Sequence, residues 1–154
     1  MDQLFVEERQ KLADQFTQPL AGEVTGYLQC LFGKDARAAV GWDGKGFSGL
    51  RLFRPGPDGM LEFSQLSGGA REQVAAALRL AMAEVLAADH EGCLPVVFDD
   101  AFAYADPERV KILQRMLDLG ASRGLQIIVL SCNPADYAAL GAKPVELVTT
   151  SYAN

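Results

Sequence analysis

The residues best suited to chemistry begin with a serine and two glycines placed directly before a long, alanine-rich stretch. "LSGG" at 66–69 precedes "AREQVAAALRLAMAEVL", and we expect a helix over about 67–88. Helix N-termini present unpaired N–H groups and a partial positive charge, and glycines let an anion approach them closely. The Ser67 hydroxyl can donate a further hydrogen bond. The stretch therefore fits phosphate binding at Gly68 and Gly69, and it also fits an ordinary N-cap serine followed by a flexible turn.

Two adjacent carboxylates, Asp99 and Asp100, end the apolar run "LPVVFDD". The run predicts a short buried strand, and ligands bind at the carboxyl ends of strands in open α/β sheets. Adjacent carboxylates repel each other and favour a cation or a proton. One can hold Mg²⁺ through water while the other orients an attacking water. Two alternatives stay open, namely a solvated acidic turn and a simple Mg²⁺ or Ca²⁺ site formed together with Asp106.

A third polar group follows a second apolar run, in "IIVLSCNPADY". Ser131, Cys132 and Asn133 come directly after this predicted strand, and Pro134 follows them. They could place a polar sensor beside the same site. An Asn-Pro pair is also a common start for a loop, so this group alone carries little weight.

The elements that must position these residues follow from periodicity and turn signals. We predict helical structure over 2–32 in two pieces, with Pro19 starting the second. Gly, Pro and Asp punctuate the next region, which predicts strands near 38–42, 47–53 and 60–63. Asp106 is the expected N-cap of a helix over 106–120, followed by Pro107. Continuous apolar strands separated by helices indicate a parallel α/β layer, with strands expected at 94–99, 125–131 and 145–149.

The overall composition limits the class of protein. The chain has 154 residues, of which 49% are hydrophobic, enough for a single domain with a substantial core. Its formal charge of −6 disfavours a broad basic surface for nucleic acid. The three cysteines show no CxxC or metal-ligand spacing, which favours a reducing compartment. The charged N-terminus lacks the apolar core of a signal peptide, so we expect a cytoplasmic protein.

In order and spacing these motifs resemble the C-terminal half of an ATP-binding-cassette (ABC) ATPase head of the SMC and SMC-like DNA-repair type. "LSGG" looks like the signature motif, "LPVVFDD" like Walker B, "AYAD" like the D-loop and "IIVLSCN" like the switch strand. The resemblance implies that Asp99 is the Mg²⁺-linked residue and Asp100 the catalytic acid. It places Asp106 in the D-loop and Asn133 at the switch position. It also implies nucleotide binding by Leu66, Ser67, Gly68 and Gly69, in trans to ATP held by another head.

The same resemblance implies an organisation, cofactors and partners. Residues 1–33 would be the helical root of a coiled coil, 34–65 a small antiparallel β region, and 66–154 the α/β lobe that carries the signature and Walker B motifs. ATP and Mg²⁺ would bind only in the complete head. The implied partners are an N-terminal lobe that contains Walker A and a second head in homodimer-like pairing. DNA would be contacted indirectly, and no membrane is involved.

The chain departs from the family pattern at several places. No GxxxxGK[ST] loop is present, and no recognisable Q-loop precedes the signature. Asp100 stands where Glu is usual, and Asn133 where His is common. We therefore expect ATPase activity only with a separate Walker A lobe, none from the chain alone, and an apolar sheet face or edge left for the missing lobe. The alternative is a non-catalytic scaffold or regulatory domain that keeps the ABC fold.

Overall fold

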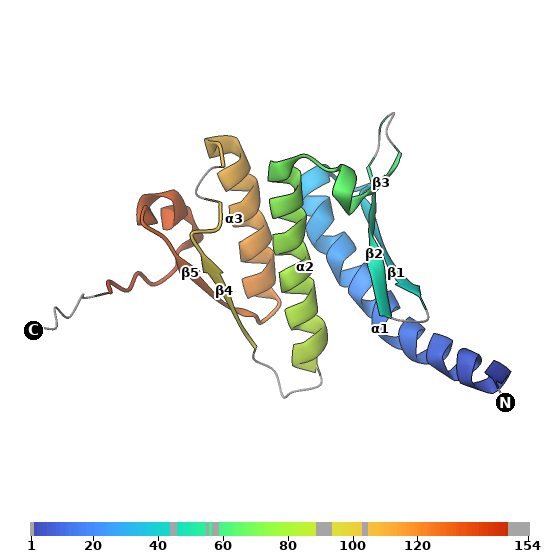
Figure 1. The fold of residues 1–154 in the computed structure, drawn as a ribbon. Coiled ribbons are helices and arrows are strands. Elements are labelled where there is room, and N and C mark those ends of the chain that lie inside the picture. Colours follow the sequence, from blue (N-terminus) through green and yellow to red (C-terminus); the bar gives the residue numbers. More distant parts are fainter. Residues whose placement is uncertain are drawn as a thin grey trace, which may run out of the picture.

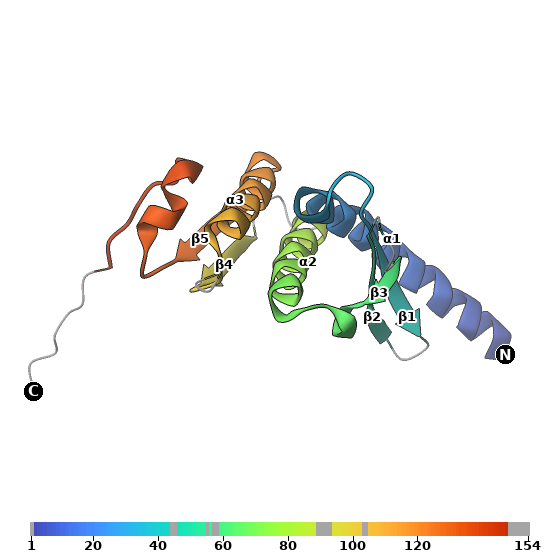
Figure 2. The same cartoon turned by 90° about the horizontal axis from the view of Figure 1, so that it is seen from above.

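Three helices lie side by side in the chain, with one small sheet on each flank (Figure 1). The structure is a computed structural model that describes residues 2–43, 46–54, 56, 59–88, 94–102 and 105–147. Seen from above, helix α2 (Gly68–Ala88) appears between helix α3 (Pro107–Ser122) and the first sheet (Figure 2). Helix α1 (Asp2–Phe32) packs against that sheet and against both other helices. This order brings the buried faces of all three helices into one core.

The first sheet is antiparallel and packs against α1. It contains β1 (Arg37–Asp43), β2 (Gly46–Phe53) and β3 (Met60–Glu62) in the order β1-β2-β3. The three strands confirm the predicted small β region. Leu50 and Leu52 of β2 are buried on its inner face, whereas Phe53 lies on the outer face. A short 3-10 turn, η1 (Phe63–Gln65), then leads into α2.

The second sheet is parallel and contains β4 (Pro95–Asp99) and β5 (Gln126–Leu130). Helix α3 connects these two strands, as the strand–helix–strand pattern predicts. Beyond β5 the chain forms a 3-10 segment, η2 (Pro134–Leu140), and then leaves the body as an extended tail (Figure 1). The mixed α/β fold class and the parallel pairing of β4 with β5 are confirmed.

The prediction that the first helix breaks at Pro19 is wrong, because α1 runs without interruption through that residue. A proline inside a helix removes one intrahelical hydrogen bond and leaves the carbonyl four residues earlier without its partner. Here Pro19 and Gln15, the residue that carries this carbonyl, are both exposed. Water can satisfy the freed carbonyl on that side, so the helix continues.

The expectations that the strands of the parallel sheet are buried and that a third strand follows at 145–149 are wrong where the structure describes them, whereas the expected open apolar face is present. Burial alternates along β4 and β5, because α2 and α3 cover only one face of the sheet. Val97 (48% exposed), Ile128 (40%) and Leu130 (36%) point to the other, uncovered face. The expected third strand is absent from 145–147, where Val145 and Leu147 are 75% and 82% exposed. Residues 148–149 of that prediction lie outside the described residues.

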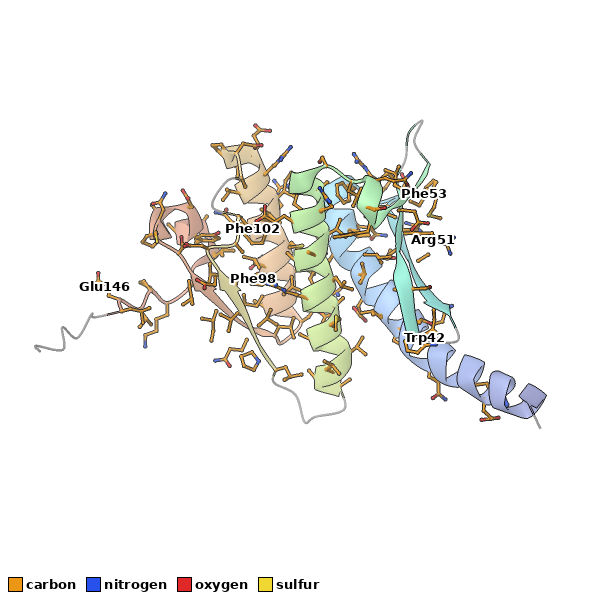
Figure 3. All side chains as sticks on the ribbon, in the orientation of Figure 1. Trp42, Arg51, Phe53, Phe98, Phe102 and Glu146 are labelled. Atoms are coloured by element: carbon orange, nitrogen blue, oxygen red, sulfur yellow. The ribbon has the colours of Figure 1, made fainter. Side chains whose placement is uncertain are left out.

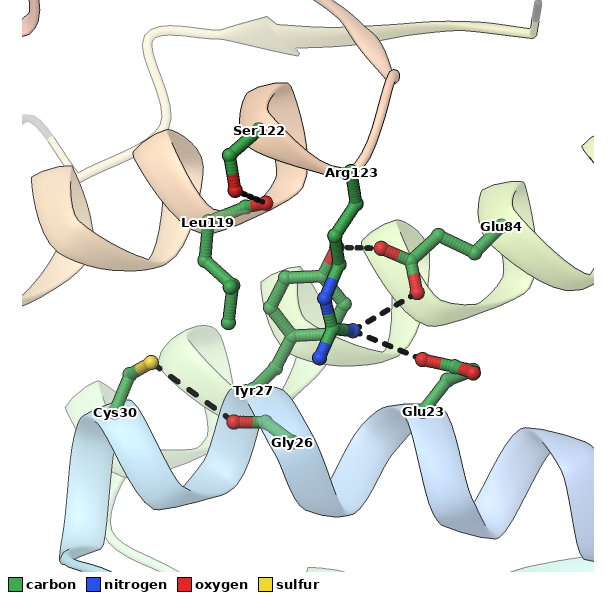
Figure 4. Close-up of polar contacts among 8 residues, drawn as sticks. All are labelled: Glu23, Gly26, Tyr27, Cys30, Glu84, Leu119, Ser122 and Arg123. Carbon is green, nitrogen blue, oxygen red and sulfur yellow. Dashed lines mark hydrogen bonds and ion pairs between the residues drawn. The ribbon is translucent and has the colours of Figure 1, made fainter. Parts of the chain in front are cut away.

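A polar junction joins the three helices where α3 ends. Nη1 of Arg123 lies 2.9 Å from Oε2 of Glu23 on α1 and 3.0 Å from Oε2 of Glu84 on α2 (Figure 4). Its guanidinium carbon lies 5.2 Å from the centre of the Tyr27 ring, and the Tyr27 hydroxyl donates to Glu84. A Cβ on Gly26 would come within 3.0 Å of Arg123 Nη2. A glycine at this point of α1 therefore leaves room for the guanidinium to approach the helix closely. We call these five residues the Arg123 junction.

Candidate functional site

The motif residues gather at one end of the molecule. The N-termini of α2 and α3 and the carboxyl end of β4 all lie at the upper end of Figure 1. This follows from topology, because β4 and β5 run parallel and both end on the same side. The "LSGG" turn, the paired carboxylates and the segment after β5 thereby lie at one end of the molecule.

The "LSGG" turn forms the start of α2. Leu66 is buried in the core, while Ser67 and Gly68 are exposed. The Ser67 hydroxyl accepts a hydrogen bond from the Ala70 N–H at 3.4 Å, and its carbonyl accepts from the Arg71 N–H at 2.9 Å. Ser67 therefore caps the helix, which the anion-binding and ordinary N-cap interpretations both allow. Its exposure leaves room for a partner in front of the helix N-terminus.

The carboxylates stand at the end of β4. Asp99 is exposed and pairs in register with Leu130, so it lies on the uncovered face of the parallel sheet. Asp100 begins a tight turn with φ of 44°, and its N–H donates to the Leu130 carbonyl at 3.0 Å. Phe102 closes the turn with φ of 75°. Two residues other than glycine in this left-handed region make 99–102 an unusual segment of backbone.

The segment after β5 contacts Asp100 directly. The Cys132 N–H donates to Oδ1 of Asp100 at 3.4 Å, and the Cys132 Sγ lies 3.9 Å from Oδ2. Asn133 is exposed and precedes η2, and its N–H donates to the Ser131 hydroxyl at 3.0 Å. The structure therefore brings the expected switch segment beside Asp100, and Cys132 makes the contact.

Asp106 caps α3, as predicted. Its Oδ1 accepts from the Arg109 N–H at 2.9 Å, and its Oδ2 lies 3.1 Å from Arg109 Nε. The same Arg109 guanidinium covers Gly69, where a Cβ would come within 2.5 Å of Nη1. The second glycine of "LSGG" is therefore needed for this close approach. Residues 103 and 104 of the expected D-loop "AYAD" lie outside the described residues.

Sequence reasoning missed three side chains at this end. Glu72 accepts the Phe102 N–H at 3.2 Å, and the Tyr137 hydroxyl donates to the Ala101 carbonyl at 2.9 Å. Arg109 is the third, through its approach to Gly69. Only Arg109 had a sequence signal, because it lies three residues after Asp106, the spacing of a helical ion pair. A pocket of about 190 Å³ opens between α2 and α3, lined by Gly69, Glu72, Gln73, Ala105, Arg109 and Leu113.

The electrostatics of this end are acidic. Burial raises the pKa of Tyr137, and the charges of Asp136, Asp100 and Glu72 raise it further, so its hydroxyl stays protonated and can donate. Among the described residues, no group of three or more His, Cys, Asp or Glu side chains could hold a metal ion. Asp106 binds Arg109 instead of joining Asp99 and Asp100. This geometry does not support the stand-alone three-aspartate site.

Among curated proteins, three mycobacterial sequences resemble this chain. Proteins described only as uncharacterized, from Mycobacterium bovis and from two strains of Mycobacterium tuberculosis, are 33% identical to it over 135 residues. The match covers 86% of this chain but only 14% of each relative, so the chain spans about one seventh of their length. No family model matches the sequence.

Solved structures show what the fold is. A structure from work on ATP-driven dimerization and DNA-stimulated activation of SMC ATPases matches 92% of this chain and 83% of its own chain, with a TM-score of 0.68 and 16% identity. The Smc head domain of Pyrococcus furiosus, bound to the C-terminal domain of ScpA, matches 90% of this chain and 34% of its own, with a TM-score of 0.65 and 16% identity. The chain has the fold of an SMC head.

One further match covers less than half of the head domain with which this chain aligns. The SMC head domain of Thermotoga maritima aligns with 86% of this chain, at a TM-score of 0.59 and 16% identity, but only 44% of that domain is matched. More than half of that head domain therefore has no counterpart in these 154 residues. Within the described residues, no helix has the length and apolar character needed to cross a lipid bilayer.

Proposed function

We propose that this chain is the C-terminal half of an SMC-like ABC ATPase head, which completes an ATP site together with a separate lobe that carries Walker A. The observation that carries the proposal is the uncovered face of the two-stranded parallel sheet. Val97, Ile128 and Leu130 are exposed there, directly beside Asp99. Contiguous apolar surface next to candidate ligand residues favours a covering partner.

Two further observations support a missing lobe. Fewer than half of the residues of the Thermotoga head domain are matched, and the match covers only 14% of each mycobacterial relative. The described part of the 145–149 segment is extended and exposed instead of paired. A strand from the partner lobe would supply the neighbour that this segment lacks. Residues 1–33 would then be the root of a coiled coil, 34–65 the β region and 66–154 the lobe.

The site residues take the following roles in the proposed head. Ser67 and the N-terminus of α2, with Gly68 and Gly69, would face the γ-phosphate of a nucleotide held by a second head. Asp100 would orient the attacking water in its own head, and Asn133 would lie beside it. Positions next to a strand's carboxyl end suit such roles, because the backbone there is held by the sheet while the side chains reach solvent.

Asp99 fits a role at Mg²⁺, because its exposed carboxylate is a hard oxygen ligand at the end of β4. Mg²⁺ at nucleotide sites is commonly held by one or two carboxylates together with the phosphates, so the described residues need not supply a full set of ligands. When bound with ATP, the ion neutralises phosphate charge. The chain's own contribution is to present Asp99 on the uncovered face and to keep Asp100 beside it.

A role in DNA repair or chromosome maintenance is part of the same proposal. Its support is the SMC-like ATPase fold together with the description of one structural neighbour as a DNA-stimulated SMC ATPase. Pairing with a second head is proposed on the same grounds, since that neighbour dimerizes with ATP. DNA would then be contacted by the assembly and not by a basic surface of this chain, whose net charge is −6.

The test is Mg-ATP titration of the chain alone and of the chain co-expressed with a Walker A lobe encoded in the same genome. We expect no binding in the micromolar range, about −8 kcal/mol, from the chain alone, and binding with hydrolysis from the complex. Micromolar affinity for the isolated chain would contradict the half-head proposal. A stable complex that binds ATP without hydrolysing it would favour the scaffold alternative.

A further inference from the structure

The geometry points to Glu72 and Tyr137 as positioning residues that hold the 99–102 turn, and with it Asp100, against the first turns of α2. This inference rests on the proposed function for its catalytic consequence, but the contacts can be tested without any nucleotide. Both residues lie inside stretches quoted in the sequence analysis, but no role was assigned to either of them there. Both act through the backbone of the turn and not on a substrate.

The turn needs to be held because its backbone is unfavourable. Asp100 and Phe102 both have positive φ, at 44° and 75°, a region that residues with side chains rarely adopt. Such conformations persist when the surroundings over-determine them. The Phe102 ring is buried, with its centre 5.8 Å from that of Phe98 (Figure 3), which anchors one end of the turn. Hydrogen bonds from Asp100 to Leu130 and from Cys132 to Asp100 hold its other end, and Ala101 and Phe102 have polar contacts of their own.

Glu72 supplies the first polar contact, from α2. It lies five residues after Ser67, and its carboxylate accepts the Phe102 N–H at 3.2 Å. Hydrogen bonds to a charged acceptor are stronger than those between neutral groups. A single side chain thus connects the first turns of the "LSGG" helix to the turn that carries Asp100.

Tyr137 supplies the second contact, from η2. Its hydroxyl donates to the Ala101 carbonyl at 2.9 Å, one residue from Phe102. The hydroxyl stays protonated, and so remains a donor, because burial and the nearby acids raise the pKa of Tyr137 and disfavour the tyrosinate. The backbone of the turn is therefore hydrogen-bonded to two different elements, to α2 through Glu72 and to η2 through Tyr137.

The consequence is a mechanical link between two parts of the proposed site. A displacement of the α2 N-terminus, such as phosphate binding in front of Ser67 would cause, is passed by Glu72 to the turn that orients Asp100. Arg109 strengthens this link, since it is bound to Asp106 and covers Gly69. In a pair of heads, each chain would contact the nucleotide of the other head through Ser67 and the nucleotide of its own head through Asp100. The contact between Glu72 and the turn would therefore couple the two nucleotide sites.

The contacts are tested first in the chain alone, by NMR amide hydrogen exchange at Phe102. Glu72→Ala should speed exchange of this amide about tenfold, while amides in the core of α2, such as that of Leu80, keep their protection. Glu72→Gln keeps a carbonyl acceptor and should restore most of the protection. The matched control is Glu108→Ala, which removes an exposed acid from the first turn of α3. Unchanged exchange at Phe102 in Glu72→Ala would overturn the inference.

The catalytic consequence is tested in the head reconstituted with its Walker A lobe. Glu72→Ala and Tyr137→Phe should each lower kcat for ATP about tenfold, with KM changed by less than about twofold, because neither side chain binds the nucleotide. Glu72→Gln should recover most of the rate. Parental kcat in Glu72→Ala would overturn the positioning role. If the parent head itself proves inactive, the proposed function fails, and the exchange experiment alone then decides whether Glu72 and Tyr137 hold the turn.

Discussion

Asp100 is held by its own chain more tightly than a free surface acid. Its N–H is bound to Leu130, its carboxylate accepts from Cys132, and its φ is positive. Aspartate is one methylene shorter than the glutamate usual at this position in the family that the sequence resembles. The tight turn and the Cys132 contact set where this short side chain points, so its orientation depends on the backbone around it.

The residue-scale prediction about catalysis is that Asp100→Asn nearly abolishes ATP hydrolysis in the reconstituted head. Losing an oriented group that stabilises the transition state typically costs roughly a hundredfold in rate. ATP-driven pairing of heads should survive, because the nucleotide stays uncleaved in a closed site. Phosphate release and sedimentation velocity measure the two effects separately. Hydrolysis at the parental rate would contradict the catalytic role and favour the scaffold alternative.

Ser67→Arg is the complementary variant for that experiment. A bulky side chain in front of α2 would fill the place proposed for the phosphate, so pairing itself should fail. In mixed dimers that carry one Asp100→Asn chain and one Ser67→Arg chain, the Ser67 change should impair the nucleotide site of the other head, while the Asp100 change impairs its own. Loss of activity at the wrong site would contradict the assignment of Ser67 as acting in trans.

A second residue-scale prediction concerns pH and Glu23. Its hydrogen bond with Glu84, its burial and the Glu84 charge raise the pKa of Glu23 above the ordinary 4.5, and these effects outweigh the opposing one of Arg123. Because the folded state disfavours ionised Glu23, the stability that this group contributes is present at low pH and is lost as pH rises through the raised pKa. Glu23→Gln should therefore gain stability relative to the parent chain as pH rises above about 4.5.

Urea unfolding at a series of pH values from about 4 to about 7 measures this difference. The exposed Glu108→Gln, which removes a carboxylate away from the Arg123 junction, is the control variant. A gap between Glu23→Gln and the parent that shrinks as pH rises would show that the Arg123 ion pair dominates the titration of Glu23.

At the scale of elements, glycines decide how closely the helices approach. Gly120 of α3 sits where a Cβ would meet the Ile127 side chain at 3.1 Å, the Tyr27 hydroxyl at 3.2 Å and Leu80 at 3.4 Å. Gly22 of α1 has nothing within 4 Å of the same position. Both residues are glycines inside helices, but a side chain at Gly120 would be crowded whereas one at Gly22 would meet open space.

Gly22→Ala should raise the free energy of unfolding by about 0.5 to 1 kcal/mol, because alanine is the better helix former. Gly120→Ala should lower it by about 1 kcal/mol, because overpacking among three elements outweighs the same gain in helix propensity. Chemical denaturation monitored by circular dichroism measures both. A stabilising Gly120→Ala would show that α1 and β5 can move away from α3 at little cost.

The elements also show which features the sequence can predict. Turn signals and periodicity predicted β1, β2, β3 and α2 closely, and the Asp106-Pro107 pair marked the start of α3, because these signals act over a few neighbouring residues. An apolar face or edge left open was expected from the missing Walker A loop, but the apolar runs alone predicted buried strands, since an apolar run does not tell whether one or both faces are covered. The strand expected at 145–149 is absent from 145–147, the described part of it, because a strand needs a neighbour and the described residues provide none there.

The residues of the candidate site also fall into those that the sequence could predict and those that it could not. Its motif residues could be found because each lies at the end of a recognisable element. Glu72 and Tyr137 could not, because their contacts join segments 30 and 36 residues apart in the chain. Nothing in the types of these residues distinguishes them from an exposed helix acid and an ordinary loop tyrosine.

At the scale of the whole molecule, the uncovered face of the parallel sheet should govern association. We expect the double change Val97→Lys with Ile128→Lys to abolish binding of the Walker A lobe and to reduce self-association of the chain alone. Both side chains point away from the core, and burying an unpaired lysine in an interface is costly. Analytical ultracentrifugation measures self-association, and co-purification measures the complex.

Met82→Lys is the matched control for that face. Met82 is 45% exposed and lies on α2, not in either strand of the parallel sheet, so its replacement should leave the complex intact. A complex that survives the double change in β4 and β5 would contradict the proposal that the missing lobe covers this face.

The shape of α1 has a consequence for how force would travel through the chain. Its N-terminal end projects beyond the antiparallel sheet in both views (Figures 1 and 2). The Arg123 junction binds α1 at Glu23, nearer to its other end. At about 1.5 Å per residue, the arm from Asp2 to Glu23 is about 32 Å long. A tilt of about 10° at the junction would move its tip by about 5 Å, by lever geometry applied to that helical rise. The N-terminal part of α1 would therefore act as a lever arm that turns about the Arg123 junction. A small rotation at the junction would produce a large displacement of the tip, and a displacement of the tip would produce a small rotation at the junction.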